Sequence, residues 1–516
     1  MAERPRPPAA DVPRVRHNDW SSLSVPDLGR WRPTRSVSVV VPAYQCQSTL
    51  DLVLAALAYQ TYPAHLLEVV VVDDGSQPPL ELPKLRPEHT RLVRVDSGWG
   101  RANALRVGAA ASHGDIIHWL DADMLVHPEH VEAQARWHHV VPYAVTLGWK
   151  RFVDPPWPTP EEVADACAAG RADRLFAGRP SQGHDYVERY VARTAGLREA
   201  DHLAFLVHVG ATAALRRELY DAAGGMDASL RLGEDTELGF RLAQAGAVFV
   251  PEPAARGWHL GPSHMMRHRE ALQRYNRPFL AERMPLPRWL RRRGGAGAVP
   301  LVTAVVDVTG HRLEEVCDTV DSLLRGEEPD LRVVLVGPWQ RLTGERVPPL
   351  SDPWLDLRLI EASYRADPRV RLARQAPASV FPSPYLLRVP ATRPLPPDGV
   401  RRLVQYADQE RLGLVRTTDG VELWRTAAVG RARWVQRAGE SLADVVSDVY
   451  GAATVPGDQV GRRPPPSVEV AGVRSLVRAA GLVAWLAADR ARARLRRLAA
   501  PQRSAGPRTA RRRRRA

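Results

Sequence analysis

Residues 113–128 (HGDIIHWLDADMLVHP) constrain the fold more than any other stretch of this sequence. The apolar run of Ile116, Ile117, Trp119 and Leu120 is long enough for a buried strand and too short for a helix. It stops at Asp121-Ala122-Asp123, and a helical pattern opens a few residues later. Two carboxylates one residue apart at the end of a buried strand repel each other, and a hard divalent cation would offset that cost. A turn in which both side chains cap the following helix remains an open alternative.

Three further apolar runs precede this stretch, at residues 37–41 (VSVVV), 69–72 and 92–95. Each ends in a polar turn, and helical patterns follow the first run and the third. Strands that alternate with helices predict a parallel, doubly wound α/β sheet. In such sheets ligands bind beyond the carboxyl ends of the strands, where these polar turns gather.

The composition describes an ordinary soluble protein of several domains. The 516 residues predict two to four domains, and 44% apolar with 25% charged residues is typical of globular chains. The three cysteines lie far apart and give neither a disulfide framework nor a zinc-ligand spacing, which favours a reducing cytoplasm. The sequence shows no signal-peptide pattern and no apolar stretch of membrane-spanning length.

The net charge of +14 is concentrated in residues 288–293 (RWLRRR) and after residue 490. Nucleic acid, an anionic membrane face and a solvated tail are all compatible with it. No fingerprint of a nucleic-acid-binding module accompanies the charge, so we expect no specific nucleic acid partner. Residues 470–498 fit a basic amphipathic helix in peripheral contact with an anionic membrane. A partly disordered tail fits them equally well.

Five motifs stand in one order and register: VVVPAY, VVVDDGS, GWGRANALRVGAAASHGD, WLDAD and GEDTELGFRLAQAGAVFVPEPAARGWHLG. Together they resemble the family 2 glycosyltransferases, which have the GT-A fold of nucleotide-diphospho-sugar transferases. The segment that begins at Gly233 also resembles a galactosyltransferase-type C-terminal segment. The resemblance covers roughly residues 36–280. It implies a mixed, doubly wound sheet and a nucleotide-sugar donor.

The resemblance implies a metal site. Asp121 and Asp123 match the DxD motif of the family, with Asp123 expected to bind the metal directly and Asp121 expected to contact the metal or the ribose. Hard oxygen ligands suit Mn²⁺ or Mg²⁺. His259 stands where related enzymes place a further ligand, and an imidazole would favour Mn²⁺. A half-buried histidine in a strand-end turn remains the alternative for His259.

The first strand ends carry the residues expected to bind the nucleotide. Pro42, Ala43 and Tyr44 match the loop that packs on base and ribose. The acceptors for the uracil edge are expected to be Asp73 and Asp74, without a choice between them, and this makes UDP the expected nucleotide. Arg101 and Asn103 match the segment that closes over base and phosphates.

Inverting transfer needs a base for the acceptor hydroxyl. Gly233-Glu234-Asp235 matches the ED motif of the family, which assigns Asp235 as the base and Glu234 as its support. Simple capping of the helix at residues 236–245 is the alternative. Residues 149–151 (Trp-Lys-Arg) follow another apolar run and are candidates for the donor or acceptor pocket.

After a basic, glycine-rich linker at residues 286–298 the pattern begins again. Residues 301–308 echo the first strand, and residues 383–405 echo the strand, DAD and helix, with Pro390 and Thr392 in place of the two aspartates. We therefore predict an irregular arm (1–35), a catalytic GT-A domain (36–285), a degenerate GT-A-like domain (299–460) and a basic tail (461–516). An unrelated α/β domain is the alternative for residues 299–460.

These features predict a cytoplasmic, metal-dependent inverting glycosyltransferase that uses a UDP-sugar. Its acceptor is expected to be a hydroxyl of a cell-envelope or lipid-linked glycan, with placement at the inner membrane face left open. A catalytically inactive GT-A scaffold is the alternative, against which the intact DAD and ED motifs argue. A nucleotidyltransferase would need a glycine-rich phosphate loop after the first strand, and residues 42–47 offer none.

Overall fold

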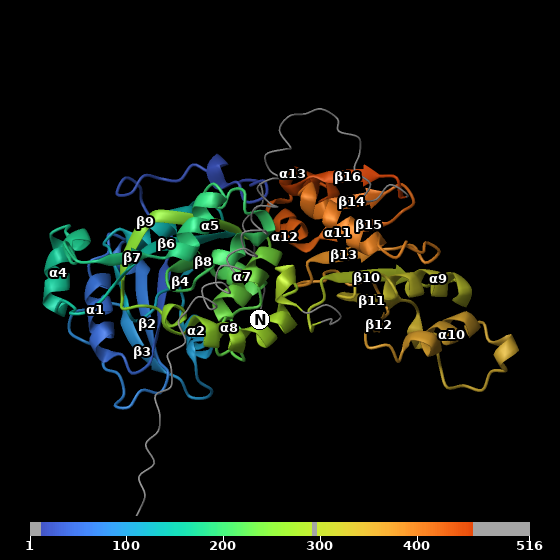
Figure 1. Ribbon diagram of the computed structural model, residues 1–516, viewed down its shortest axis with the longest axis horizontal. Helices are drawn as coiled ribbons and strands as arrows, with labels where there is room; N and C mark the ends of the chain where they lie inside the picture. Colours follow the sequence, from blue (N-terminus) through green and yellow to red (C-terminus); the bar gives the residue numbers. More distant parts are fainter. Residues whose placement is uncertain (1–11, 292–296, 458–516) are drawn as a thin grey trace, which may run out of the picture. The chain divides into compact units, whose positions relative to one another are not determined.

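The computed structural model describes residues 12–291 and 297–457, and they contain two α/β sheets (Figure 1). The strands of the first sheet are β1 (Val37–Ala43), β2 (Leu67–Asp73), β3 (Thr90–Arg94), β4 (Ile116–Trp119), β5 (Met124–Val126), β6 (Ala144–Val153), β7 (Ser181–Gly183), β8 (Ala213–Arg216) and β9 (Val248–Leu260). Its helices are α1 (Gln47–Leu57), α2 (Arg101–Ala111), α3 (His130–Val140), α4 (Pro160–Ala168), α5 (Asp185–Arg193), α6 (Arg217–Ala222), α7 (Glu234–Gln244) and α8 (His264–Arg283).

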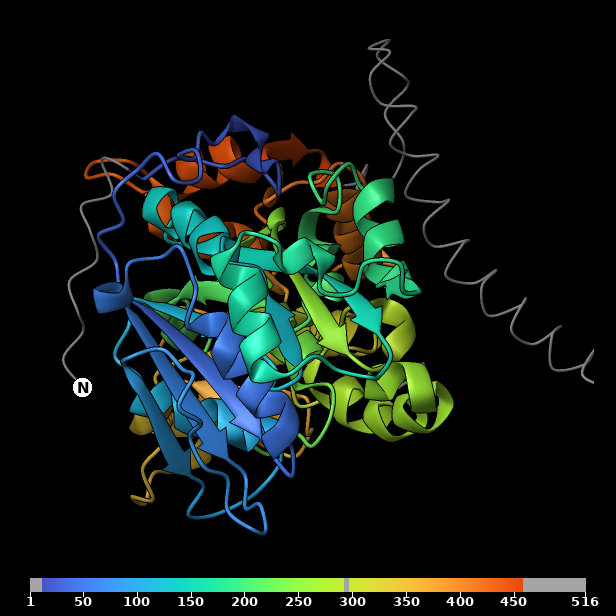
Figure 2. The same cartoon turned by 90° about the vertical axis from the view of Figure 1, so that its left-hand side faces the viewer.

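The strand order of the first sheet is β3-β2-β1-β4-β8-β6-β9-β5, with β7 paired to β6. Strands β1 to β4 are parallel, β8 is antiparallel to both β4 and β6, and β6 and β9 are parallel. Figure 2 shows the blue strands β1 to β3 side by side. The mixed, doubly wound sheet that the resemblance implies is confirmed, whereas the parallel sheet predicted from the strand pattern alone holds only for β1 to β4. The carboxyl ends of β1, β2 and β4 carry residues 42–44, 73–74 and 121–123.

Both faces of this sheet are covered, which explains its continuous β-branched runs. Val39 and Val41 belong to one core cluster with the buried face of α1. On the other face α2 packs closely, because a Cβ atom on Gly108 would lie 2.3 Å from Val40 and 2.9 Å from Val72. A glycine at this position therefore lets the helix approach the strands.

The N-terminal arm is held by polar side chains rather than by regular structure. Asn18 donates to the main-chain oxygens of Leu197 and Phe249 and accepts from the Phe249 amide. Trp20 donates to Gly196, and the indole of Trp31 donates to Glu132. Both tryptophans of the arm are thus tied to the first α/β unit.

The second sheet contains strands β10 (Val302–Asp307), β11 (Leu331–Val336), β12 (Val370–Ala373), β13 (Tyr385–Arg388), β14 (Leu414–Thr417), β15 (Glu422–Arg425) and β16 (Ala452–Val455). Its helices are α9 (Leu313–Leu324), α10 (Leu355–Tyr364), α11 (Gly399–Gln409), α12 (Thr426–Val435) and α13 (Leu442–Tyr450).

The strand order of the second sheet is β12-β11-β10-β13-β15-β14-β16. Its strand directions follow the same succession as β3-β2-β1-β4-β8-β6-β9: three parallel pairs, two antiparallel pairs and a final parallel pair. The registers correspond as well, since Ile116 of β4 faces Arg216 of β8 and Tyr385 of β13 faces Arg425 of β15.

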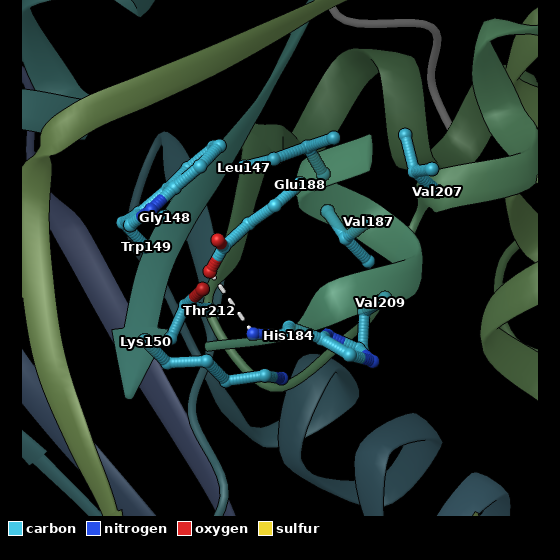
Figure 3. Close-up of a pocket in the computed structure, with 10 residues that line it drawn as sticks. All are labelled: Leu147, Gly148, Trp149, Lys150, His184, Val187, Glu188, Val207, Val209 and Thr212. Carbon is cyan, nitrogen blue, oxygen red and sulfur yellow. Dashed lines mark hydrogen bonds between the residues drawn. The ribbon is translucent and has the colours of Figure 1, made fainter. Parts of the chain in front are cut away.

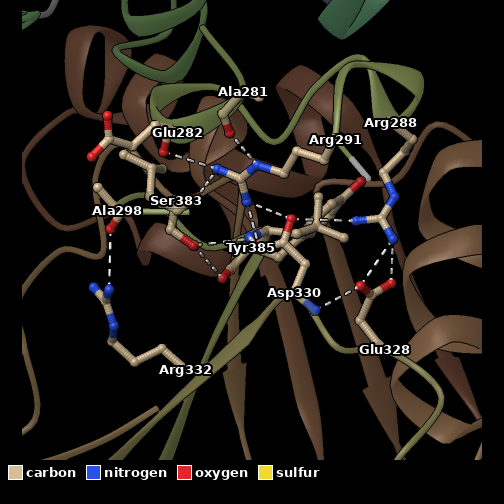
Figure 4. A network of polar contacts seen from close by, with 12 residues as sticks. Ala281, Glu282, Arg288, Arg291, Ala298, Glu328, Asp330, Arg332, Ser383 and Tyr385 are labelled. Atoms are coloured by element: carbon tan, nitrogen blue, oxygen red, sulfur yellow. Dashed lines mark hydrogen bonds and ion pairs between the residues drawn. The ribbon is translucent and has the colours of Figure 1, made fainter. Parts of the chain in front are cut away.

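Two arginines of the basic linker form ion pairs with acidic residues that precede β11 (Figure 4). Arg288 forms an ion pair with Glu328, and Arg291 forms one with Asp330, which also accepts from the Leu301 amide. Both carboxylates are buried. These two arginines therefore join α8 and the linker to the start of the second sheet, and their charge is neutralised internally.

No helix among residues 12–291 and 297–457 is both long and apolar enough to cross a membrane. The predicted amphipathic helix at 470–498, the arginine run at 511–515 and linker residues 292–296 lie outside the described residues.

Candidate active site

One arginine joins the acidic residues of two distant motifs. Arg101, the first residue of α2, donates from Nε (2.9 Å) and Nη2 (2.7 Å) to Oδ1 of Asp121, directly after β4. Its Nη1 lies 2.8 Å from Oε1 of Glu234 and 2.8 Å from Oδ1 of Asp235, at the start of α7. The DAD and ED motifs, more than 100 residues apart in the sequence, thus meet at one guanidinium.

Two glycines shape the approach to Asp235. Gly233 caps α7 with a left-handed backbone (φ 82°), a conformation that suits glycine. A Cβ atom on Gly210 would lie 2.3 Å from Oδ1 of Asp235 and 2.9 Å from Nη2 of Arg101. His208, two residues earlier, places its Nδ1 2.6 Å from the main-chain oxygen of Asp235. The segment before β8 therefore lies directly against this carboxylate.

The two acids of the ED motif have opposite pKa shifts. Burial favours the neutral form of Asp235, but Arg101 and then His208 outweigh it and lower its pKa. Burial and the neighbouring Asp235 raise the pKa of Glu234, which Arg101 only partly offsets. Asp235 is consequently the member of the pair that stays ionised and able to accept a proton.

Asp123 and His259 lie together because β5 pairs with β9. Met124 faces His259 in this ladder, and the Leu260 amide donates to the main-chain oxygen of Asp123. Oδ1 of Asp123 is 3.6 Å from Nε2 of His259, and no described residue donates a hydrogen bond to this buried oxygen. Burial, with a contribution from Lys150, lowers the pKa of His259 to about 4, so the imidazole is neutral.

An unpaired carboxylate oxygen beside a neutral imidazole fits a divalent cation. The described residues contain no cluster of three or more histidine, cysteine or acidic side chains of the kind that encloses a metal. Asp121, the third predicted ligand, is bound to Arg101 instead. A cation at Asp123 and His259 would therefore take further ligands from outside the chain.

Of the residues predicted to bind the nucleotide, some are already hydrogen-bonded within their own loops and others keep a polar atom or a ring available. Asp73 is buried and accepts from the amides of Ser76 and Leu80, and Asn103 is buried and donates to Ser97. Both side chains thus form hydrogen bonds within their own loops. In Asp74 one oxygen accepts from the Gly100 amide and the other is buried without a partner among the described residues.

The other nucleotide candidates lie at the end of β1. Tyr44 is 60% exposed, and Pro42 and Ala43 form the last two residues of the strand beside it. An exposed aromatic ring at a strand end offers a surface for a planar base.

Residues 149–151 lie in the second half of β6, after the buried run at residues 144–147 that opens the strand. Lys150 is buried, and its ammonium interacts with Asp121, Asp235 and Asp123. Arg151 instead donates to Ser181 of the short strand β7. Of the three, Lys150 alone belongs to the acidic cluster.

His184, which precedes α5, and Glu188 on α5 were not predicted as site residues. Together with Trp149 and Lys150 they line a pocket beside the acidic cluster (Figure 3). The chain before them is rich in proline and glycine, and the signal that could have found them is the His-Glu spacing of four residues.

Comparisons with known proteins give matches for part of the chain. Residues 38–221 match the model of the family described as glycosyl transferase family 2. A validoxylamine A glucosyltransferase from Streptomyces hygroscopicus subsp. limoneus is 27% identical over 275 residues, which cover 51% of this chain and 60% of that protein. A pre-mycofactocin glycosyltransferase from Mycobacterium tuberculosis is 29% identical over 230 residues, 43% of this chain and 42% of that protein.

The chain therefore spans less than two thirds of the length of these relatives. Among solved structures, a mannosyltransferase from Pyrobaculum calidifontis in complex with GDP-Man and Mn²⁺ aligns with a TM-score of 0.33 and 19% identity. That alignment covers 55% of this chain and 65% of the mannosyltransferase.

Proposed function

We propose that the family 2 glycosyltransferase domain formed by residues 38–221, completed by α7 and β9, transfers a sugar from a nucleotide diphosphate to a hydroxyl acceptor with inversion. The observation that carries this proposal is the meeting of Asp121, Glu234 and Asp235 at Arg101. Carboxylates from separate motifs are costly to bring together, and a capping role for each would not require their convergence.

Asp235 is the proposed base. As the acceptor oxygen forms a bond to the anomeric carbon, the bond from that carbon to the diphosphate oxygen breaks, and the acceptor proton passes to Asp235. The nucleoside diphosphate leaves with the bonding electron pair. Glu234 supports this step by sharing Arg101 with Asp235, because one guanidinium then fixes the position of both carboxylates.

Asp123 and His259 are the proposed protein ligands of Mn²⁺ or Mg²⁺, with the imidazole favouring Mn²⁺. Such an ion, when bound, neutralises charge on the leaving diphosphate. Asp121 is proposed to position Arg101, whose positive charge lies at the same strand end. This differs from the sequence-based prediction in two ways: Asp121 has an indirect role, and Arg101 holds the carboxylates rather than the base and phosphates.

UDP is the proposed nucleotide. Asp74 has a buried oxygen without a partner in the described structure, and a uracil N–H would supply one. Tyr44 is exposed beside it for contact with the base and ribose, next to Pro42 and Ala43. Asp73 and Asn103 are proposed to support these loops through the hydrogen bonds they form there.

Residues 299–460 are proposed to be a degenerate copy of the same fold. The matching strand order and register support this, and Pro390 and Thr392 follow β13 by the same interval at which Asp121 and Asp123 follow β4. A proline and a threonine cannot replace two carboxylates as metal ligands. The proposed boundaries are an arm at 1–35, the catalytic domain at 36–285, a linker at 286–298 and a tail at 461–516.

The proposed location is the cytoplasm, where three unpaired cysteines are stable. The proposed acceptor is a hydroxyl of a cell-envelope or lipid-linked glycan, with the basic tail as a peripheral contact to an anionic membrane face. No specific nucleic acid is proposed as a partner.

Thermal stabilisation by UDP, with and without Mn²⁺, tests the proposal on the wild type, Asp123→Asn and a control, Asp318→Asn, at an exposed position of α9. We expect stabilisation by UDP to require Mn²⁺, to be lost in Asp123→Asn and to persist in Asp318→Asn. A donor screen for UDP release would then identify the sugar. Stabilisation that ignores both metal and substitution would remove Asp123 from the mechanism, and its complete absence would favour an inactive scaffold.

A further inference from the structure

Helix α8 (His264–Arg283) exposes more large apolar side chains than any other element that the structure describes. Tyr275 and Phe279 are 42% and 41% exposed, and the centres of their rings lie 5.0 Å apart. Met265, Met266 and, in the turn after the helix, Trp289 are exposed as well. Because α8 lies at the outer edge of the first α/β unit (Figure 2), this group is presented to the surroundings.

After the kink at His268, α8 has an inner face and an outer face. The inner face contains Leu272, Asn276 and Leu280 and packs on the protein. A Cβ atom on Gly233 would lie 3.1 Å from the Leu280 side chain and 3.2 Å from the Asn276 amide. The outer face repeats at the i, i+4, i+7 and i+8 positions of a helix, and its residues are all exposed: Ala271, Tyr275, Pro278 and Phe279. Packing on the protein needs the inner face only, so the fold does not account for the outer one.

The outward side of α8 also carries positive charge. The helix contains five arginines and two glutamates. Arg283 pairs with Asp227 and Glu282. The other four arginines are exposed and form no ion pair within the part of the chain that the structure describes: Arg267, Arg269, Arg274 and Arg277. Arg288 and Arg291 of the linker, in contrast, are neutralised by buried carboxylates. The charge of α8 therefore remains available to attract an anionic surface.

This combination fits a lipid bilayer better than a protein partner. Aromatic side chains beside arginines are typical of helices that lie in the boundary between lipid headgroups and acyl chains, where guanidinium groups contact the phosphates. A partner protein that binds a helix usually encloses it in a groove. The inner face of α8 is already occupied, so a groove cannot enclose this helix, whereas a flat and deformable surface can reach its outer face.

We propose that the outer face of α8, together with its four exposed arginines, docks the catalytic unit on an anionic lipid bilayer. This inference goes beyond the proposed function, which assigned membrane contact to the tail alone, and it depends on no step of the transfer reaction. Helix α8 begins shortly after His259 and packs against Gly233, the residue before Glu234. Docking through α8 therefore holds the acidic cluster close to the membrane surface, where a lipid-linked acceptor is presented.

Co-sedimentation of the full chain with vesicles tests the inference. The vesicles contain phosphatidylglycerol mixed with phosphatidylcholine, or phosphatidylcholine alone. We expect the wild type to bind the first kind of vesicle and not the second, with binding that weakens as salt is added. Tyr275→Ser with Phe279→Ser, and separately Arg274→Gln with Arg277→Gln, should each lower the partition coefficient by about tenfold or more.

Matched control variants are available in the second α/β unit. Val347→Ser with Leu350→Ser changes two exposed apolar side chains, and Arg346→Gln with Arg365→Gln changes two exposed arginines. Both control variants should bind the vesicles as the wild type does. UDP-dependent thermal stabilisation should be the same in all four double variants, which shows that each of them is folded.

The outcomes separate this inference from the proposed function. If the two α8 variants bind vesicles as tightly as the wild type, another surface such as the tail makes the contact and the inference is wrong. A wild type that binds no vesicles also overturns it, and an acidic protein would then be the partner that the charge of α8 fits. Vesicle binding needs neither UDP nor Mn²⁺, so both results leave the proposed function in place. A wild type that binds vesicles but no UDP would contradict the proposed function and support this inference.

Discussion

The two sheets of this chain share one strand order and differ in the residues that come directly after their strands. After β2 and β4 the first sheet carries Asp73-Asp74 and Asp121-Ala122-Asp123, whereas β11 and β13 lead into Gly337-Pro338 and Pro390-Ala391-Thr392. The core positions of the strands remain apolar in both. The comparison teaches that strand pairing needs the apolar runs, while the chemistry resides in a few residues at the strand ends.

Each sheet has a buried arginine at the same position of its strand order. Arg216 ends β8 and donates to the last turn of α3, at the His138 oxygen. Arg425 ends β15 and donates to the last turn of α11, at the Ala407 oxygen. A cation at a helix C-terminus stabilises its unpaired carbonyl groups. These two arginines occupy the same register position and make the same kind of contact with a helix C-terminus.

The largest difference between the two sheets should appear in the rate of sugar transfer, when an acid in the first turn of α7 or of α13 is substituted. Asp235→Asn removes the proposed base, so sugar transfer should fall about 10² to 10⁴-fold. Asp444→Asn changes an exposed acid in the first turn of α13 and should leave transfer within experimental error. UDP release with saturating donor and acceptor measures both. A residual rate near the wild type in Asp235→Asn would assign the base elsewhere.

The second largest effect, on stability, should come from Arg431 of α12, which contacts the loop after α7. Arg431 is fully buried and donates to the main-chain oxygens of Gly246, Ala247, Val15 and His17. Arg431→Met leaves these acceptors unpaired and should lower the free energy of unfolding by about 3 kcal/mol. Urea denaturation followed by fluorescence measures the change.

Arg433→Met, on an exposed position of the same helix, is the control for Arg431. It should change the free energy of unfolding by less than about 0.5 kcal/mol. An effect of Arg431→Met as small as that of Arg433→Met would mean that the contact between α12 and the loop after α7 adds little stability.

Much of the first sheet could be read from the sequence, because its signals are local. The runs at 37–41 and 69–72 and the DAD stretch each specify a strand and its end without reference to the rest of the chain. The pairing of Arg101 with Glu234, 133 residues away, has no local signal. The roles of Asp73 and Asn103 were also unreadable, because a loop-holding side chain and a ligand-binding one have the same residue type and spacing.

The second sheet shows the same division between local and distant information. Its strands and the loss of the two aspartates are visible in the sequence. The absence of a helix equivalent to α2 is not visible in the sequence. Residues 374–384, between β12 and β13, contain no helix, and α10 lies earlier, between β11 and β12. Apolar periodicity identifies helices but does not say which face of a sheet they cover.

A smaller effect on stability should result from changing the contact between the first sheet and α2, a helix for which the second sheet has no equivalent. Gly108→Ala places a methyl group 2.3 Å from Val40, so the helix must shift, and the free energy of unfolding should fall by about 1–3 kcal/mol. Val305 is the counterpart of Val40 in β10. Because residues 374–384 place no helix between β12 and β13, Val305→Ile should cost less than about 1 kcal/mol. Equal costs in urea denaturation would show that this face of the second sheet is packed as tightly as the first.

The smallest effect should come from restoring the aspartates to the second sheet. Pro390→Asp with Thr392→Asp recreates the DAD spacing after β13, yet the histidine, the arginine and the ED acids that surround Asp121 and Asp123 have no counterparts there: α13 begins with Leu442 and Ala443. Two carboxylates alone bind Mn²⁺ weakly. We therefore expect one Mn²⁺-dependent UDP site per chain in this double variant, as in the wild type, by isothermal titration calorimetry. A second site would show that the strand-end aspartates suffice for donor binding and that the second sheet lost its chemistry through these two residues alone.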